Sequence, residues 1–455
     1  MSLRRMLSRV AVCTAVAASV ALAAAPAMAA PAAPAPPAAP AEATPTPQAT
    51  APVPDDANDP VRSQEYWLDA SHIRDAWRTT LGEGVTIAVL DTGIGAAGGA
   101  FGNSVVGGID MSGVGSKDGR TPVGVINSDH GTLVASTAAA PGKADGTGLI
   151  GVAPRAELLS VSLGFPGSSS TVPFSEQVAK GMRWAVDHGA DVINLSFTTN
   201  TLDWDPSWDD AFLYAYEHDV VVVVAAGNRG SGTSIVGAPA TIPGVLTVGG
   251  VGKDGVVSRE ASTQGITIGV MAPSEQLLGL TADGTVVGWE GTSGAAPIVA
   301  GAAALVRAAH PGISADDVIN RLIRTAVRVP GMTRTPDVQY GYGLLDVNAA
   351  VTASVPHVTT NPMGDLKDWI RVYRRAASPT DPTPVATSTP VAIAPLPPAD
   401  RPSEPGSPLL PTAETLRYGT LPLLALTVPG IVIALGVTAA ARRIRMERGR
   451  RTPTP

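Results

Sequence analysis

The sequence contains one cysteine, Cys13, few aromatic residues (4%) and few charged residues (16%). A single cysteine excludes an intramolecular disulfide and any metal site built from several thiolates. A formal net charge of −7 argues against nucleic-acid binding, so we expect no nucleic-acid partner. There is no dense acidic loop of the kind that binds calcium, and we predict neither a metal nor a cofactor. Stability must therefore come from buried apolar side chains, and hydrophobic residues make up 44% of the 455 residues.

The N-terminal 60 residues show no sign of a packed core. Residues 1–29 are typical of a secretory signal, with a basic start, an apolar run and an Ala27-Met28-Ala29 cleavage site. The alternative is an N-terminal anchor that is retained. Residues 30–60 are rich in alanine and proline, and we predict that they are disordered.

The C-terminal part predicts a membrane anchor. Residues 356–417 are interpreted as a Pro-rich linker, and residues 418–441 carry no charge and are long enough to span a bilayer. The alternative is a buried core helix, but no downstream domain remains to bury it. Residues 442–455 are rich in arginine, which the positive-inside rule assigns to the cytoplasm. We therefore expect a single-pass protein of the cell membrane whose large domain, residues 61–355, is extracytoplasmic.

Residues 61–355 alternate between short apolar runs and helical stretches. The predicted strands are 85–90, 158–161, 192–195, 220–225 and 245–248. The predicted helices are 132–140, 174–188, 208–218, 295–309, 314–327 and 347–353. This alternation predicts an α/β domain with three layers (α/β/α), in which helices cover both faces of a mainly parallel sheet. Functional groups in such sheets gather at the carboxyl ends of the strands.

A small, glycine-flanked segment precedes the most alanine-rich run in the chain. Gly291-Thr292-Ser293-Gly294 leads into this run, and Pro297 suits the first turn of a helix. Ser293 should then lie at or just before a helix N-terminus, beside free N–H groups and the positive end of the helix dipole. Taken alone, the Thr-Ser pair is more typical of an ordinary helix N-cap than of a catalytic site.

Two further motifs supply the partners that a nucleophilic serine needs. Asp91-Thr92-Gly93 follows a predicted strand, and Asp129-His130-Gly131 opens a predicted helix. A serine hydroxyl needs a nearby base, and imidazole has a suitable pKa. The imidazole in turn needs a carboxylate to fix its tautomer. In isolation, Asp91 could be a turn residue and His130 an ordinary helix-start histidine.

Together the three motifs resemble those of the subtilisin-like serine proteases, the subtilase family. The resemblance implies that Ser293 is the nucleophile, His130 the general base and then acid, and Asp91 the orienting carboxylate. Asn228, which follows an apolar strand, is similar to the asparagine of the family's oxyanion hole. Without the other motifs, Asn228 would be interpreted as a turn residue.

The resemblance also implies a substrate-binding segment and a subfamily. The segment comprises Ser196, Phe197 and Thr198. Many subtilisins have glycine at the position of Thr198, so a β-branched residue could narrow the pocket for the residue before the cleaved bond. The aromatic extension at 64–77 and the C-terminal anchor with its basic tail resemble mycosins, the membrane-anchored subtilases associated with type VII secretion. The lack of disulfides is a departure from that pattern.

The implied function is that of an extracytoplasmic serine endopeptidase. Its expected partners are protein or peptide substrates, the membrane and the type VII secretion machinery. The alternatives are a general cell-surface subtilase unrelated to secretion and a subtilase-fold scaffold of a secretion complex. Because Tyr66, Trp67 and Trp77 offer large apolar surfaces, we expect the extension to be a permanent part of the fold.

Overall fold

A computed structural model describes residues 59–124, 128–143, 145–230, 232–233, 235–330, 332, 334–374 and 435–443. The chain divides into two units, Met1–Pro379 and Thr380–Pro455. The predicted signal at 1–29, nearly all of the Ala/Pro-rich stretch at 30–60 and the predicted linker beyond residue 374 lie outside the described residues.

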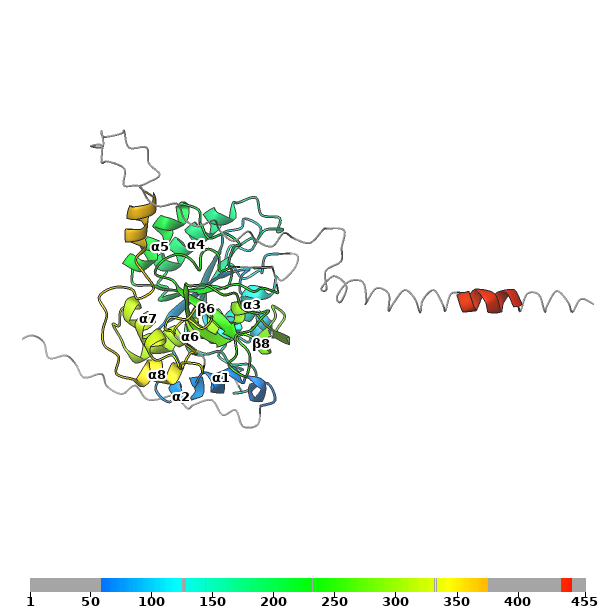
Figure 1. Ribbon diagram of the computed structural model, residues 1–455, viewed down its shortest axis with the longest axis horizontal. Coiled ribbons are helices and arrows are strands. Elements are labelled where there is room, and N and C mark those ends of the chain that lie inside the picture. Colours follow the sequence, from blue (N-terminus) through cyan, green and yellow to red (C-terminus); the bar gives the residue numbers. More distant parts are fainter. Residues whose placement is uncertain are drawn as a thin grey trace, which may run out of the picture. The chain divides into compact units, whose positions relative to one another are not determined.

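The first unit alternates strands with helices, as Figure 1 shows. Its strands are β1 (Thr86–Asp91), β2 (Val105–Asp110), β3 (Glu157–Ser162), β4 (Val192–Leu195), β5 (Val221–Ala225), β6 (Leu246–Val251), β7 (Ile268–Pro273), β8 (Leu277–Leu280) and β9 (Val286–Trp289). Its α-helices are α1 (Trp67–Ala70), α2 (Ile73–Ala76), α3 (His130–Ala139), α4 (Phe174–Asp187), α5 (Ser207–Glu217), α6 (Thr292–Ala309), α7 (Ala315–Arg324), α8 (Val347–Thr352) and α9 (Leu366–Trp369). Three short helical segments are η1 (Arg62–Gln64), η2 (Ala97–Gly99) and η3 (Ile370–Arg374).

A seven-stranded parallel sheet with helices on both faces confirms the predicted α/β class. The strand order is β2-β3-β1-β4-β5-β6-β7, and every pairing in it is parallel. Alternate residues of β5 enter different cores: Val221 and Val223 join one, and Val222 and Val224 join the other. Helices α3 and α6 contribute to the first core, and α4 and α5, side by side in Figure 1, contribute to the second. Strands buried on both faces explain why these segments are continuous apolar runs.

Four strands were not predicted. β2 and β7 are the edge strands of the main sheet, and β8 and β9 form a separate antiparallel hairpin. β2 contains Gly107 and Gly108 and is only partly buried, so its sequence lacks a strong strand pattern. The hairpin had a usable signal, because Asp283-Gly284 lies between its two short apolar runs.

The packed domain extends beyond residue 355, so the predicted domain end and the start of the predicted linker at 356 are too early. Leu366 of α9 is buried, and the ring centroids of Trp369 and Trp204 are 4.4 Å apart. Arg374 forms a 2.9 Å ion pair with Asp209 of α5. These contacts join positions far apart in the sequence, so local composition could not indicate them. Helix α7 also ends at Arg324, earlier than the predicted residue 327.

The N-terminal extension packs tightly onto the domain. Trp67 and Trp77 are almost completely buried, and Nε1 of Trp77 donates a 2.7 Å hydrogen bond to the carbonyl of Val152. Nε of Arg62 donates to the carbonyl of Gly148 at 2.8 Å. This packing agrees with the expectation that the extension belongs to the fold.

One helix among the described residues is long and apolar enough to cross a membrane. It is α6, and 78% of this helix is buried inside the first unit, so it is a core helix. The predicted anchor at 418–441 lies mostly outside the described residues. Its described part, 435–441, is helical. The anchor and the orientation of the chain stay predictions.

Candidate active site

The carboxyl ends of three neighbouring strands bring the predicted site residues to one edge of the sheet. Asp91 is the last residue of β1, Ser196 directly follows β4, and Asn228 comes shortly after β5. β1, β4 and β5 are consecutive in the sheet and run in the same direction, so their ends meet at one edge. His130 and Ser293 reach this edge from the first turns of α3 and α6.

Asp91 and His130 are directly hydrogen-bonded. Nδ1 of His130 lies 2.8 Å from Oδ1 of Asp91, and the Asp91 side chain is fully buried. The N–H of Thr92 donates to the same oxygen at 2.7 Å. Oδ2 of Asp91 is also buried, with no hydrogen-bond partner among the described residues. An ionised carboxylate can only accept, so this contact places the proton of a neutral imidazole on Nδ1 and leaves Nε2 free to act as a base.

Thr92, Gly93 and Gly131 bring the end of β1, which carries Asp91, against the start of α3, which carries His130. Oγ1 of Thr92 donates to the carbonyl of Ser128 at 2.7 Å and accepts from the N–H of Gly131 at 2.8 Å. A Cβ on Gly131 would lie 2.6 Å from the carbonyl oxygen of Gly93, whose own φ is +107°. A side chain on Gly131 would push the strand end away from the helix start, and one on Gly93 would lie 2.7 Å from the carbonyl oxygen of Gly119 in a backbone conformation that favours glycine. The glycines therefore allow Asp91 and His130 to approach each other.

The environment of His130 favours its protonated form once a proton arrives. Burial acts to lower the pKa of His130, but the negative charge of Asp91 and their hydrogen bond outweigh it and raise this pKa above its ordinary value. The indole of Trp289, at the end of β9, lies edge-to-face against the imidazole with ring centroids 6.0 Å apart. Only 26% of the His130 side chain remains exposed. The base is thus shielded but stays able to take up a proton.

The helix that carries Ser293 begins earlier than predicted. α6 starts at Thr292, so Ser293 is its second residue, and Pro297 lies in the second turn rather than the first. Proline at this position removes the N–H that would otherwise bond to the carbonyl of Ser293. Oγ of Ser196 donates to that carbonyl instead, at 2.9 Å. This substitute bond satisfies the carbonyl and ties the end of β4 to the predicted nucleophile.

The hydroxyl of Ser293 points toward the same strand end. Its Oγ donates to the carbonyl of Ser196 at 3.0 Å. Among the described residues there is no hydrogen bond between Ser293 and His130, although both line one cleft. Rotation about the Cα–Cβ bond of Ser293 can exchange one acceptor for another without moving the backbone. Catalytic hydrogen bonds of ligand-free enzymes often tighten only when substrate binds.

Thr292 holds Asn228 in one orientation. The N–H of Thr292 donates to Oδ1 of Asn228 at 2.7 Å, and its hydroxyl donates to the same atom at 2.9 Å. The N–H of Gly227 donates to that hydroxyl at 3.0 Å. A backbone N–H can only donate, so the amide atom that faces Thr292 is the oxygen. Nδ2 of Asn228 and the N–H of Ser293 have no acceptor within the described part of the chain.

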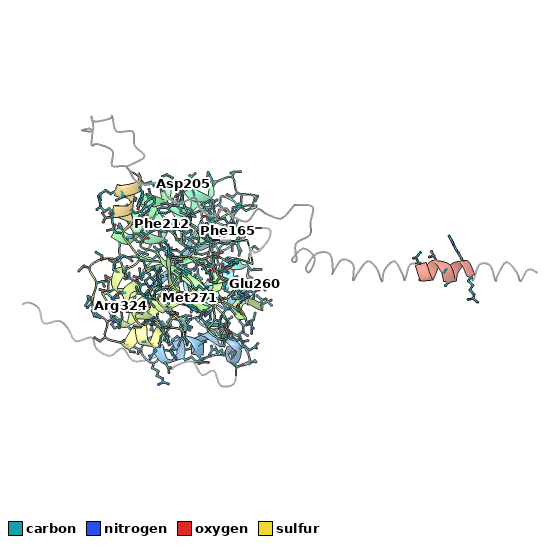
Figure 2. All side chains as sticks on the ribbon, in the orientation of Figure 1. Phe165, Asp205, Phe212, Glu260, Met271 and Arg324 are labelled. Atoms are coloured by element: carbon teal, nitrogen blue, oxygen red, sulfur yellow. The ribbon has the colours of Figure 1, made fainter. Side chains whose placement is uncertain are left out.

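A cleft of about 500 Å³ joins these groups. Its lining includes His130, Ser196, Phe197, Thr198, Asn228 and Ser293. Phe165, labelled in Figure 2, follows β3 and also lines the cleft. Its ring lies 5.5 Å from that of Phe197 and 5.1 Å from that of Phe174, so one wall is aromatic. No cluster of three His, Cys, Asp or Glu side chains suited to a metal ion occurs among the described residues.

The fold is α/β, and one cleft at the carboxyl edge of its sheet holds Ser293, Asn228 and a histidine bonded to a buried carboxylate. Residues 82–343 match the subtilase family, peptidase S8, and the chain belongs to this family. It is 36% identical over 276 residues to subtilisin DY from Bacillus licheniformis, which covers 59% of this chain and 91% of that protein. Because its relatives in the family are serine endopeptidases, the chain is a subtilisin-like serine protease.

Solved structures of mycosins are similar to this chain, in agreement with the resemblance found in the sequence. MycP1 with its N-terminal propeptide removed is 29% identical with a TM-score of 0.55, over 65% of this chain and 98% of that one. MycP3, a protease from the type VII (ESX-3) secretion system, is 30% identical with a TM-score of 0.54, over 63% of this chain and 88% of that one.

Sequence reasoning missed three residues that shape the site. Thr292, which orients Asn228, stands next to Ser293 in the motif, but its role depends on a partner 64 positions away. Trp289, which covers His130, belongs to the unpredicted hairpin. Phe165 follows β3 at the carboxyl edge, and that position was a usable signal.

Proposed function

We propose that Asp91, His130 and Ser293 are the catalytic triad of a membrane-anchored, extracytoplasmic serine endopeptidase. The observation that carries the proposal is the 2.8 Å hydrogen bond between Asp91 and His130, in a cleft that also contains Ser293. In acylation, Nε2 of His130 takes the proton of Ser293, and Oγ of Ser293 attacks the carbonyl carbon of a peptide bond. Asp91 stabilises the imidazolium that results.

The tetrahedral intermediate carries a negative oxygen that needs fixed donors. Nδ2 of Asn228 and the N–H of Ser293 supply them, since neither has an acceptor among the described residues and Thr292 keeps the amide of Asn228 from turning. One such donor contributes about 3 kcal/mol to the transition state. The donors are already in place before the reaction, so no reorganisation is needed when the charge develops.

The remaining steps reuse the same base. When the intermediate collapses, the C–N bond breaks and His130 gives its proton to the leaving amine. Water then attacks the acyl carbon on Ser293 while His130 takes a proton from the water. When this second intermediate collapses, the bond from the acyl carbon to Oγ of Ser293 breaks, His130 returns its proton to Oγ, and the carboxylic product leaves. The catalytic groups return to their starting states.

We place this activity at the cell surface in association with type VII secretion. Support comes from the likeness to MycP1 and to MycP3, the latter a protease from a type VII secretion system. The predicted signal at 1–29, the predicted span at 418–441 and the arginine-rich tail agree with an extracytoplasmic domain anchored from its C-terminal side. Substrates are then proteins or peptides that reach the outer face of the membrane.

The test combines peptide hydrolysis with comparative secretome proteomics. Ser293→Ala should lower kcat by a factor of about 10⁴ or more and leave one or more secreted proteins unprocessed. The matched control is Ser63→Ala, which removes an exposed hydroxyl whose one hydrogen bond to a described residue is with the carbonyl of Pro60. Hydrolysis that survives in Ser293→Ala contradicts the catalytic assignment. Loss of hydrolysis with an unchanged secretome contradicts the link to secretion and favours a general surface protease.

A further inference from the structure

Two chain segments bound the part of the cleft next to Ser293. One contains Ser196 and Thr198, and the other contains Gly227 and Asn228. This inference rests on the proposed function. If Ser293 attacks a carbonyl carbon whose oxygen faces Asn228, the side chain just before the cleaved bond must lie between these two segments. The size of the space between them therefore limits which residue can precede the cleaved bond.

Two methyl groups close this space over Gly227. A Cβ on Gly227 would lie 2.6 Å from Cγ2 of Thr198 and 2.6 Å from Cγ2 of Thr233. Both methyl groups therefore lie over Gly227, where a side chain on that residue would project. Thr198 and Thr233 both belong to the cleft lining. The buried Ala225, also in the lining, adds only another small side chain.

The Thr198 side chain is fixed in this position. Its Oγ1 donates to the carbonyl of Gly237 at 2.8 Å and lies 3.3 Å from the carbonyl of Ala238. With the hydroxyl held there and χ1 restricted by β-branching, the methyl group cannot swing away from Gly227 without losing the bond. A large side chain therefore meets a wall that cannot rotate aside.

The backbone behind Thr198 cannot retreat either. The N–H of Thr199 donates to the carbonyl of Ala238 at 2.7 Å, and the N–H of Ala238 donates to the carbonyl of Thr201 at 2.8 Å. A Cβ on Gly237 would lie only 1.8 Å from the carbonyl oxygen of Thr199. The backbone segments that contain Thr199 and Gly237 therefore already touch, and neither can move toward the other. The pocket is rigid as well as narrow.

We propose that Thr198 and Thr233 are specificity-determining residues that restrict the residue before the cleaved bond to glycine, alanine or serine. Their methyl groups occupy the space that a leucine or phenylalanine side chain would need. A pocket that fits a side chain closely distinguishes differences of one methylene group by about 10- to 200-fold in kcat/KM. The substrates are thus polypeptide segments with small residues at the cleavage position.

The experiment measures kcat/KM of the full-length protein in nonionic detergent. The substrates are peptide p-nitroanilides that differ only in the last residue: alanine, serine, valine, leucine or phenylalanine. We expect kcat/KM for alanine to exceed that for leucine and phenylalanine by about 100-fold. In the double variant Thr198→Ser, Thr233→Ser, which keeps both hydroxyls and removes both methyl groups, the ratio should fall about tenfold or more.

Two further variants separate the methyl groups from other effects. Thr199→Ser removes a methyl group from the neighbouring residue outside the cleft lining and should leave the preference unchanged. Thr198→Val removes the hydroxyl bond but puts a methyl group at both γ positions, so the space over Gly227 stays filled and the preference for alanine should be retained. A fluorophosphonate probe, whose small leaving group does not enter this pocket, reports on Ser293 independently.

The outcomes distinguish the two proposals. If Ser293 is labelled and the wild type cleaves after phenylalanine as fast as after alanine, the size restriction is wrong while the proposed function stands. If the serine variants leave the preference unchanged, the assignment to these two methyl groups is wrong. If Ser293 is not labelled and no peptide is cleaved, the proposed function fails, and the specificity assignment fails with it.

Discussion

Glu65 provides a sharp test of how the N-terminal extension is held. Its side chain is fully buried in the contact between the extension and the domain. Oε1 accepts a 3.1 Å hydrogen bond from the N–H of Ile150. Burial raises the pKa of Glu65 from 4.5 to about 8, although the Ile150 bond and the charge of Arg62 act to lower it. At neutral pH the folded protein therefore holds this carboxyl protonated.

The sign and size of the effect follow from linkage. Between pH 4.5 and about 8 the folded state binds a proton that the unfolded state has released. The free energy of unfolding therefore falls as the pH rises through this window, and the stabilisation is complete only below it. A difference of about 3.5 in pKa, at about 1.4 kcal/mol per unit, corresponds to roughly 5 kcal/mol.

Glu65→Gln removes the titration with little change in shape. We expect the stability of the variant relative to wild type to rise by roughly 4 kcal/mol between pH 5 and pH 9. Urea unfolding of the full-length protein in nonionic detergent, followed by tryptophan fluorescence, measures this difference at each pH. Gln64→Ala, a change in the exposed neighbour that adds and removes no titratable group, should show a difference from wild type that does not depend on pH. Parallel pH curves for Glu65→Gln and wild type would refute the reasoning.

Three more predictions concern the triad, the oxyanion donors and the extension. Asn228→Ala should lower kcat by about 10²–10³ with little change in KM. Thr292→Val should reproduce part of this loss in kcat, whereas Thr292→Ser should not. An effect of Asn228→Ala that is confined to KM contradicts the oxyanion role. Asp91→Asn should lower kcat by about 10⁴. It should also lower the pKa of His130, which Asp91 raises, so the acid limb of the pH–rate profile should move to lower pH; an unmoved limb contradicts the coupling. Starting the mature chain at Leu81 removes the buried Trp67 and Trp77 and should lower the melting temperature; an unchanged melting temperature with higher activity would make the extension a removable inhibitor.

The sequence predicts the parts of this fold whose signals are local. The apolar runs at β1, β4 and β5 are bounded by glycine or polar residues, and their ends carry Asp91, Ser196 and Asn228. Because parallel strands share a carboxyl edge, the convergence of these residues could be predicted without a structure. Helices α4 and α5 were placed within one residue of their bounds for a similar reason, since each is amphipathic.

The features that the sequence did not predict depend on partners far along the chain. The carbonyl of Ser196 accepts a hydrogen bond from Oγ of Ser293, and Oγ of Ser196 replaces the bond to the Ser293 carbonyl that Pro297 cannot make. These partners are 97 positions apart, so the start of α6 could not be placed from the helix sequence alone. Arg374 pairs with Asp209 across 165 positions, which extends the domain past its predicted end. The sequence suggested that Thr198 narrows the pocket for the residue before the cleaved bond. The physical basis comes from the structure, where the Thr198 methyl group lies over Gly227 and its hydroxyl bonds to the carbonyl of Gly237. Such contacts have no periodic or compositional signature.

The most direct test of the central claim is to map the residue that a fluorophosphonate modifies. The full-length protein is labelled in nonionic detergent, digested and sequenced by mass spectrometry, with a heat-denatured sample as the control. Since only a hydroxyl with an adjacent base is activated, the account predicts one adduct, on Ser293, which is absent from the denatured sample and from His130→Ala. An adduct on a different serine, or no adduct on the folded protein, would contradict the account.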